Sequence, residues 1–240
     1  MNYQDTFKRC EIKYLLSSWQ KDALCAAMMP YMEPDEYGRS TIMNIYYDTP
    51  DHLLIRRSLE KPVYKEKLRL RSYGIASADT GVFIELKKKY KGIVYKRRIS
   101  AGESEAMNYL NRGIPLQQDN QILREIEYFR SFYRELKPSM VISYEREAFR
   151  GIFQPELRMT FDENILWREE ALSLRVGPYG TSILKRGQVL LEIKVSGAMP
   201  LWLAAKLSEL GVFGTSFSKY GNAYLQKQMT DIYSQERIAL

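Results

Sequence analysis

Apolar and polar residues alternate with a period of two over much of the chain from Arg39 onward. This is the period of β-strands, and the Gly, Pro and Asp residues that interrupt it are typical of turns. Strands are predicted over residues 64–73, 82–89, 95–99, 141–148, 157–162 and 190–196. The pattern therefore favours a fold made mostly of antiparallel β-structure.

Five helices are predicted among these strands. Ser17 can cap the first, because a hydroxyl at a helix start accepts from free backbone N–H groups, and Pro30 ends it. A second helix is expected between Gly102 and Gly113. The remaining three are expected over residues 120–136, 200–210 and 218–235.

The length and composition fit one globular domain. The chain has 240 residues, 45% of them hydrophobic, and no stretch rich in Pro, Gly or Ser divides it. A single domain over residues 1–240 is therefore predicted, with a tail after about residue 233 that is expected to fray.

The composition disfavours several chemistries. The two cysteines, Cys10 and Cys25, are too few for a disulfide framework and are expected to be buried thiols. The single histidine, His52, cannot form a histidine metal cluster, and the sequence does not supply the partners that a Ser-His-Asp triad needs. Neither glycine-rich phosphate motif of the common nucleotide folds occurs. Without a bilayer-spanning apolar run or a secretory layout at the start, the chain is expected to be cytoplasmic.

The charge balance favours a polyanionic partner. The chain has 36 Lys and Arg residues against 29 Asp and Glu residues, a formal net charge of +7 at pH 7. Such an excess attracts nucleic acid, anionic lipid or phosphate-rich small molecules. The positions of the cations should decide between these partners.

The cations follow one face of the predicted strands. Over residues 64–73, one parity carries four of them, Lys65, Lys67, Arg69 and Arg71, and the other parity is largely apolar. The polar parity of the other five strands carries Lys87, Lys96, Arg98, Arg146, Arg158 and Lys194. Few carboxylates accompany them.

Two geometries explain this distribution. An open antiparallel sheet can pack one face on helices and leave the charged face in water. Alternatively, the strands close into a barrel, with helices on the apolar outside and the basic parity in the lumen. Repulsion and desolvation among lumenal cations are costly unless a polyanion enters, so the barrel requires a ligand, and a linear chain of phosphates fits it well.

Carboxylates beside the cations are the candidate metal ligands. Glu192 can hold Mg²⁺ or Mn²⁺ that also bridges phosphate oxygens, or it can form a salt bridge to a neighbouring cation. Glu11 and Glu85 lie in the same Glu-x-Lys setting and are second candidates. Asp162 can join them, although its position near a predicted strand end favours a turn residue.

The start of the last predicted helix is a candidate phosphate site. Ser218 can cap this helix, leaving backbone N–H groups and Lys219 to meet a phosphate, and capping alone is the alternative. Residues 46–50, Tyr-Tyr-Asp-Thr-Pro, are expected to run from a strand into a turn and are assigned no chemistry.

Seven short motifs together resemble a known family. They are Tyr47-Asp48-Thr49, Lys67-Leu68-Arg69-Leu70-Arg71, Phe83-Ile84-Glu85-Leu86-Lys87, Tyr144-Glu145-Arg146-Glu147-Ala148-Phe149, Arg158-Met159-Thr160-Phe161-Asp162, Leu191-Glu192-Ile193-Lys194 and Phe217-Ser218-Lys219-Tyr220. Their order and spacing resemble the VTC domain, the polyphosphate polymerase branch of the triphosphate tunnel metalloenzymes. The likeness extends from about Arg9 to Tyr224.

The resemblance implies a fold and a set of site residues. The implied fold is α+β: a closed antiparallel β-barrel that forms a tunnel with a basic lumen, surrounded by about five helices. By motif match, Glu192 is the metal ligand, for Mn²⁺ or Mg²⁺. The implied phosphate-binding and catalytic residues are Lys13, Arg69, Arg71, Lys87, Lys96, Arg146, Arg158, Lys194 and Lys219, and the substrate-binding residues are Tyr144, Ser218, Glu11 and Glu85.

The activity that the resemblance implies is transfer of the terminal phosphoryl group of ATP to a growing polyphosphate chain. The acceptor phosphate is its own nucleophile, which agrees with the missing His and Cys machinery. Related tunnel hydrolases begin with Glu-x-Glu-x-Lys, whereas this chain has Arg9 before Glu11 and Lys13. Loss of the first acidic residue favours the transferase over a two-metal triphosphatase.

Two alternatives to the polymerase stay open. One is a tripolyphosphate or nucleoside-triphosphate hydrolase on the same scaffold, and the other is a polyanion-binding module without catalysis. The expected partners are ATP and polyphosphate or triphosphate, and nucleic acid is disfavoured. Because members of the family often work beside membrane proteins, a membrane-protein partner at the inner face of a membrane is also an expectation.

Overall fold

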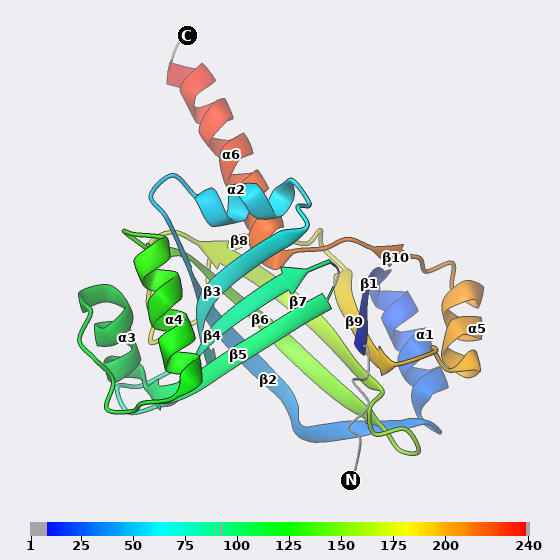
Figure 1. Ribbon diagram of the computed structural model, residues 1–240. Helices are drawn as coiled ribbons and strands as arrows, with labels where there is room; N and C mark the ends of the chain where they lie inside the picture. Colours follow the sequence, from blue (N-terminus) through cyan, green and yellow to red (C-terminus); the bar gives the residue numbers. More distant parts are fainter. Residues whose placement is uncertain (1–8, 92, 239–240) are drawn as a thin grey trace. The chain divides into compact units, whose positions relative to one another are not determined.

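The computed structural model describes the backbone of residues 9–91 and 93–238 and the side chains of residues 10–91 and 93–232 (Figure 1). The expected fraying after about residue 233 therefore falls outside the described side chains. The described part of the chain contains six helices and ten strands, one helix more than the sequence predicted. None of the described helices is both long and apolar enough to cross a membrane.

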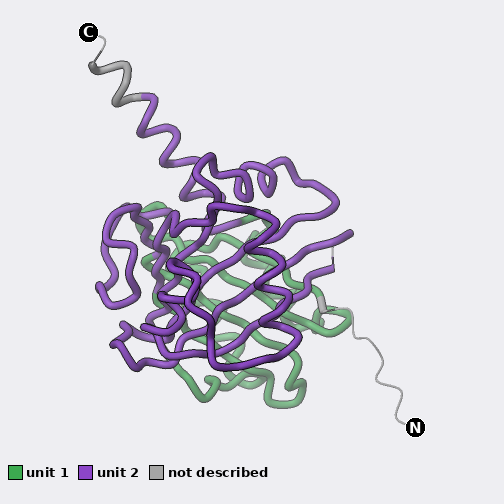
Figure 2. Tube along the Cα trace, turned by 60° about the vertical axis from the view of Figure 1, so that its left-hand side comes forward, with its two compact units in different colours: residues 1–40, 145–164, 184–217 green, residues 41–144, 165–183, 218–240 purple. Residues whose placement is uncertain are grey.

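The contacts divide the chain into two compact units, shown in green and purple in Figure 2. Unit 1 contains Met1–Ser40, Glu145–Asn164 and Leu184–Phe217, and unit 2 contains Thr41–Tyr144, Ile165–Ile183 and Ser218–Leu240. Each unit is thus built from stretches that are far apart in sequence. The single domain expected from the sequence stays a prediction.

All ten strands belong to one sheet. They are β1 (Arg9–Ser17), β2 (Met32–Asp48), β3 (Tyr64–Tyr73), β4 (Gly81–Tyr90), β5 (Ile93–Gly102), β6 (Lys137–Gly151), β7 (Arg158–Arg168), β8 (Thr181–Ser182), β9 (Gln188–Ser196) and β10 (Gly214–Thr215). Their hydrogen-bonded order is β10-β1-β9-β7-β6-β2-β3-β4-β5, and β8 pairs with β7. The predicted antiparallel pairing is seen in β1–β9, β2–β3, β3–β4, β4–β5 and β7–β9.

The closed barrel expected from the sequence is not confirmed. In the described residues, the strand order has two ends, β10 and β5. Strand β10 has only two residues, so it offers few backbone N–H and C=O groups with which another strand could pair. The observed architecture is an α+β fold with an unclosed ten-stranded sheet and six helices.

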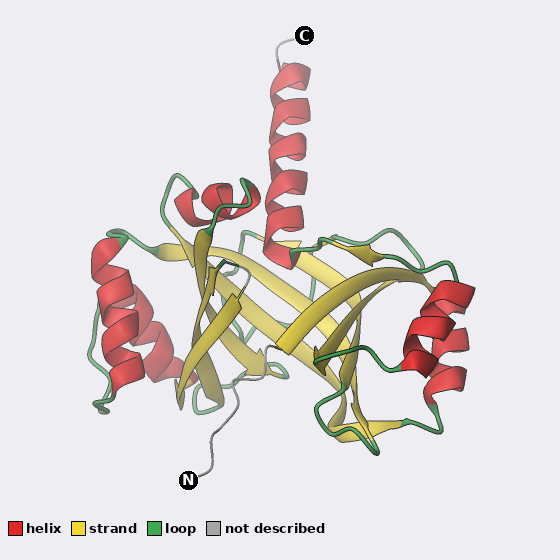
Figure 3. Cartoon of the chain, turned by 45° about the vertical axis from the view of Figure 1, so that its right-hand side comes forward, coloured by secondary structure: helices red, strands yellow, loops and turns green. Residues whose placement is uncertain are grey.

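Unit 1 packs α1 (Ser18–Met28) and α5 (Leu201–Glu209) against its strands. These two helices lie side by side at one end of unit 1, drawn red in Figure 3. Ser17 caps α1 as predicted, since its Oγ accepts from the Gln20 N–H at 3.4 Å and Gln20 Oε1 accepts from the Ser17 N–H at 2.8 Å. Leu24 and Leu203 from the helices join Ile193 of β9 in the core.

Unit 2 contains the other helices: α2 (Leu53–Leu59), α3 (Glu103–Arg112), α4 (Gln121–Phe132) and α6 (Lys219–Ile238). Helices α3 and α4 lie against β4 and β5 (Figure 1). Leu68, Leu70 and Ile84 of the sheet are fully buried with residues of these helices, which confirms the apolar parity predicted for β3 and β4. Gly113 ends α3 with a φ of 72°, a conformation that glycine adopts without a Cβ clash.

Two helix predictions needed correction. Helix α4 ends at Phe132 rather than at residue 136, because strand β6 already begins at Lys137. The sequence pattern missed α2, whose seven residues are too few for a periodic signal. The carboxylate of Asp48 accepts from the backbone N–H groups of Leu54 and Ile55, at 2.8 and 3.0 Å, and so satisfies two donors at the start of this helix.

The two cysteines are free thiols but not fully buried. Cys10, the second residue of β1, is exposed, and Cys25 is half-buried in α1. Burial raises the pKa of the Cys25 thiol, so the thiol stays protonated at neutral pH.

Candidate functional site

In unit 2, the predicted cations of β3, β4 and β5 share one face of the sheet. Arg69 lies opposite Glu85, and Lys87 lies opposite both Lys67 and Lys96. Directly opposite residues of antiparallel strands project from the same face. The structure thus brings together Lys67, Arg69, Arg71, Glu85, Lys87, Lys96 and Arg98, which we call the basic face.

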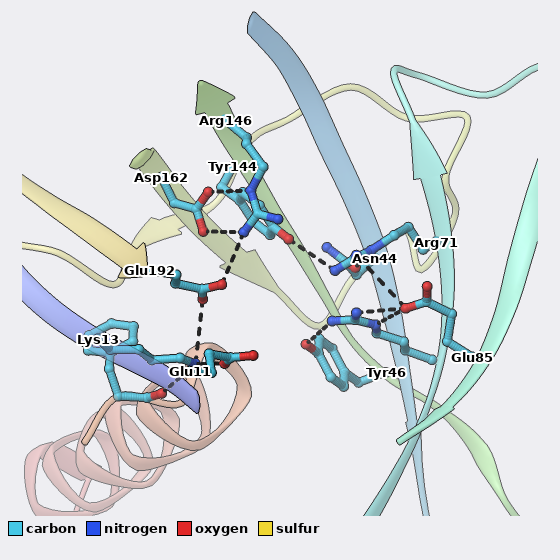
Figure 4. Close-up of polar contacts among 12 residues, drawn as sticks. Glu11, Lys13, Asn44, Tyr46, Arg71, Glu85, Tyr144, Arg146, Asp162 and Glu192 are labelled. Carbon is cyan, nitrogen blue, oxygen red and sulfur yellow. Dashed lines mark hydrogen bonds and ion pairs between the residues drawn. The ribbon is translucent and has the colours of Figure 1, made fainter. Parts of the chain in front are cut away.

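Glu85 is the centre of the basic face (Figure 4). Its side chain is 1% exposed. Arg69 donates from Nε to Glu85 Oε2 at 2.8 Å, and Lys96 Nζ lies 2.5 Å from Oε1. Burial by itself raises the pKa of the Glu85 carboxyl, but Arg69, Arg71 and Lys96 outweigh it and lower the pKa to about 2. Glu85 therefore stays ionised and holds the cations around it in place.

The two arginines of β3 are also held by polar groups of β2 and β6, and Figure 4 labels Arg71 with Asn44, Tyr46 and Tyr144. Arg69 Nη1 donates to Tyr46 Oη at 3.2 Å. Arg71 donates from Nε to Asn44 Oδ1 at 2.8 Å and from Nη2 to Tyr144 Oη at 3.0 Å. These bonds fix both guanidinium planes before any ligand arrives.

The sequence analysis missed Asn44 and Tyr46. They lie on β2 directly opposite Arg71 and Arg69, and hence on the same face. Asn44 and Tyr46 alternate with Ile45, which is fully buried. This period of two is typical of a strand and could have placed both residues on its polar face.

Positive charge is in excess on the basic face. In the described residues of β3, β4 and β5, Glu85 is the one carboxylate on this face. Burial lowers the pKa of Lys96, and Arg71 and Arg69 lower it further, while Glu85 opposes them. The cations therefore destabilise one another, and an anion bound among them would relieve that cost.

The start of α6 adds a hydroxyl and an ammonium to unit 2. Ser218 Oγ accepts from the Gly221 N–H at 3.1 Å, in agreement with the predicted cap, and from Lys67 Nζ at 3.0 Å. Lys219 is buried, and its Nζ lies 4.5 Å from the centre of the Tyr144 ring. Lys67 thus links the basic face to a helix N-terminus, which favours anions.

Unit 1 contains a second polar cluster, built on β1, β9 and β7 (Figure 4). Lys13 of β1 lies opposite Glu192 of β9, and its Nζ is 3.4 Å from Glu192 Oε1 and 3.4 Å from Glu11 Oε1. Two residue pairs further along, and so on the same face, Lys194 lies opposite both Glu11 and Arg158. The predicted residues of these three strands therefore share one face.

Arg146 of β6 completes this cluster through Asp162. It donates from Nε to Asp162 Oδ1 at 2.6 Å and from Nη2 to Oδ2 at 2.7 Å, and its Nη2 also lies 3.5 Å from Glu192 Oε2. Asp162 is fully buried within β7 and is not a turn residue. Its role is to fix the plane of Arg146.

Glu192 forms the ion pairs of the salt-bridge alternative, with Lys13 at one oxygen and Arg146 at the other. In the described part of the chain, no group of three or more His, Cys, Asp or Glu side chains is arranged to hold a metal ion. Mg²⁺ and Mn²⁺ are commonly bound by one or two carboxylates together with substrate phosphates and water. Glu192, with Glu11 on the same lysine, fits a metal that is bound jointly with a phosphate substrate.

Thr160 is a further residue that the sequence analysis did not single out. It lies on β7 directly opposite Glu192, on the polar parity. Its Oγ1 is buried and has no hydrogen-bond partner among the described residues. A buried hydroxyl without a partner is costly, so it marks a place where a ligand or water oxygen belongs.

Other proteins of known structure share this fold. A putative adenylate cyclase from Bacillus halodurans has 14% sequence identity and a TM-score of 0.54, covering 88% of this chain and 95% of that chain. A putative adenylyl cyclase from Hippeastrum, described as having a dominant triphosphatase activity, has 18% identity and a TM-score of 0.54, covering 88% and 92%. At such identities the likeness shows a shared fold.

The family follows from the sequence itself. A family model of the VTC domain matches residues 8–227, so the chain belongs to the VTC domain family. This match confirms the resemblance found in the sequence motifs. A search of curated proteins gave no match.

Proposed function

We propose that this protein is a divalent-metal-dependent polyphosphate polymerase, which transfers the terminal phosphoryl group of ATP to a growing polyphosphate chain. The observation that carries the proposal is the basic face, where six cations share one side of β3, β4 and β5 with Glu85, the one carboxylate there among the described residues, and three of them contact it. A polyphosphate chain carries about one negative charge per phosphate and matches such a row of cations. Membership of the VTC domain family supports the same substrate class.

The cations bind and orient the phosphates in this proposal. Arg69 and Arg71 hold phosphate oxygens with guanidinium planes already fixed by Glu85, Tyr46 and Asn44. Because these donors need no reorganisation, they stabilise the charge that spreads over the transferred phosphoryl group. The remaining phosphate ligands proposed are Lys13, Lys87, Lys96, Arg146, Arg158, Lys194, Ser218 and Lys219, with Tyr144 beside them.

No protein nucleophile is required. The terminal phosphate of the acceptor chain is largely ionised near neutral pH, and the protein brings it in line with the phosphoryl group. Glu192 is the proposed ligand for Mg²⁺ or Mn²⁺, with Glu11 beside it. When bound, the metal neutralises phosphate oxygens and orients them.

The second candidate activity is hydrolysis of triphosphates. The fold similarity to the Hippeastrum protein, which is described as a triphosphatase, favours it. A hydrolase needs a carboxylate that orients water, and the exposed Glu11 beside Lys13 is available for that task. Arg9, at the position of the first acid in the hydrolase motif, favours the transferase instead.

Incubation with ATP and Mn²⁺, followed by sizing of the phosphate products, tests the proposal. Long phosphate chains support the polymerase. Orthophosphate without chains would replace it with the hydrolase, and unchanged ATP would leave a polyanion-binding module. A cytoplasmic location beside a membrane-protein partner belongs to the same proposal and is tested by co-purification from a membrane extract.

A further inference from the structure

The end of the sheet in unit 2 exposes a group of apolar side chains. They are Val63, Tyr64, Tyr90, Ile93, Val94 and Tyr95, with exposed fractions of 42% to 64%. We call this group the hairpin tip, since four of its members lie where β4 meets β5 (Figure 1). None of these residues belongs to the proposed phosphate site.

Strand pairing holds the hairpin tip together at the end of the sheet, with Val94 on the same face as Lys89 and with Tyr64, Tyr90 and Ile93 on the other face. Tyr90 lies opposite both Tyr64 and Ile93 in the sheet, and the Lys91 N–H donates to the Val63 carbonyl at 3.0 Å. The three side chains in register, from β3, β4 and β5, therefore lie side by side on one face.

Exposed aromatic rings of α4 adjoin this surface. Tyr64 and Tyr133 both donate to the carboxylate of Glu66, at 2.6 and 2.7 Å. The Tyr133 ring meets Phe132 edge-on at 4.9 Å, and Phe132 stacks with Tyr128 at 6.2 Å. Phe132 and Tyr128 are 61% and 68% exposed, so the apolar surface is larger than a single scattered side chain.

Cations surround the hairpin tip. Residues 87–98 include seven Lys and Arg residues and no Asp or Glu. Lys89 lies opposite both Lys65 and Val94. The pKa of Lys65 is lowered, chiefly by burial and then by the positive charges of Lys89 and Lys61. This accumulation of positive charge complements an anionic partner and not a neutral or basic one.

The apolar side chains decide which anionic partner fits. Nucleic acid offers stacking for aromatic rings but no apolar interior for the exposed aliphatic side chains of Val63, Ile93 and Val94. A bilayer offers both an apolar boundary and an interface in which tyrosine rings are favoured. Lysines that flank such side chains bind the headgroups of anionic lipids.

We propose that the hairpin tip docks directly on an anionic phospholipid surface. Ile93, Tyr90 and Val63 enter the headgroup boundary, and Lys61, Lys89 and Lys91 lie against the lipid phosphates. This mode of attachment requires no spanning helix. The inference does not depend on the polymerase activity.

Co-sedimentation of the full chain with vesicles tests this inference. Binding is expected to vesicles of phosphatidylcholine mixed with phosphatidylglycerol, to weaken as salt rises, and to be absent with phosphatidylcholine alone. Lys89→Gln with Lys91→Gln should weaken binding about 30-fold, because each basic residue near an anionic surface raises the affinity about fivefold. The matched control is Lys185→Gln with Arg186→Gln, a pair of exposed cations in unit 1, which should bind as the parent does.

Apolar substitutions test insertion separately from charge. Tyr90→Ser with Ile93→Ser should weaken vesicle binding at least tenfold at unchanged charge. Should this variant melt below the parent, Tyr90→Trp replaces it, and quenching of its added fluorescence by brominated lipids is then expected. Vesicle binding by the lysine or apolar variants that equals the parent's would overturn the proposal. The proposal would also be overturned if these variants lost binding to a single-stranded oligonucleotide but kept vesicle binding, because the hairpin tip would then bind nucleic acid instead of lipid.

Discussion

Asp162 holds Arg146 in a bidentate ion pair, with the carboxylate fully buried within β7. The same Arg146 Nη2 that donates to Asp162 also lies 3.5 Å from Glu192 Oε2. The buried aspartate therefore aims the arginine at the proposed metal ligand. Asp162 is a positioning residue.

Asp162→Asn should destabilise the protein by about 3 kcal/mol, because the partly buried Arg146 guanidinium loses its bidentate counter-charge and keeps only the longer contact with Glu192. Denaturant unfolding measures this change. Asp51→Asn, which removes an exposed carboxylate paired with Arg56, serves as the control and should leave the unfolding midpoint unchanged. Equal midpoints for both variants would show that the buried pair contributes nothing.

Arg69→Ala with Arg71→Ala should weaken tripolyphosphate binding on the order of 100-fold, since two charge-assisted donors are lost. Calorimetric titration at constant ionic strength measures it. Arg112→Ala with Arg124→Ala removes the same charge from exposed helix positions and should cost little. Affinity in the first double variant equal to that of the parent contradicts a phosphate role for the basic face.

Glu192→Gln separates metal binding from a structural ion pair. The amide keeps the size of the side chain but removes the charge that Mg²⁺ or Mn²⁺ needs, so metal-dependent turnover should fall sharply. Tripolyphosphate binding should survive, because fewer anions remain near the cations. If the carboxylate is only a salt-bridge partner, turnover falls merely in proportion to folded protein, as a melting curve on the same preparation will show.

Thr160→Val tests whether the unpartnered hydroxyl belongs to the ligand site. Removal of a buried hydroxyl without a partner should leave the melting temperature of the free protein unchanged or higher, whereas tripolyphosphate affinity should fall about tenfold. Ser143→Ala removes a buried hydroxyl of β6 that also has no hydrogen-bond partner in the described part of the chain, and it should not change affinity. Unchanged affinity in both variants would remove Thr160 from the site.

Glu85 should make stability depend on pH in acid. Its pKa is lowered from 4.5 to about 2 on folding, so its ion pairs contribute fully above pH 4.5 and are lost as pH falls towards 2. The contribution is about 3 kcal/mol from the size of this shift. Unfolding free energies of the parent and Glu85→Gln should therefore differ at pH 5 and converge near pH 2. A constant difference across this range would contradict the ion-pair assignment, and Glu209→Gln is the exposed control.

Much of the local structure could be predicted because it depends on neighbours in sequence. The charged parity of β3 follows from a period of two, and the cap of α1 follows from Ser17 three residues before Gln20. The basic residues of the predicted strands were identified in the same way, since they lie on the polar parity, whereas Lys13 and Lys219 came from the family motifs. The family motifs indicated which of these basic residues belong to one site.

Only the tertiary structure decided which residues meet and how the strands end. Thr160, Glu192 and Lys13 form one row across β7, β9 and β1, and the period of each strand cannot fix the register between strands so distant in sequence. The same holds for Asn44 and Tyr46, whose roles depend on lying opposite Arg71 and Arg69. The sequence by itself determined the polarity of each strand face, because side chains alternate along any strand. Register, strand order and the unclosed sheet depend on backbone hydrogen bonds between distant segments, and those form only when the whole chain packs.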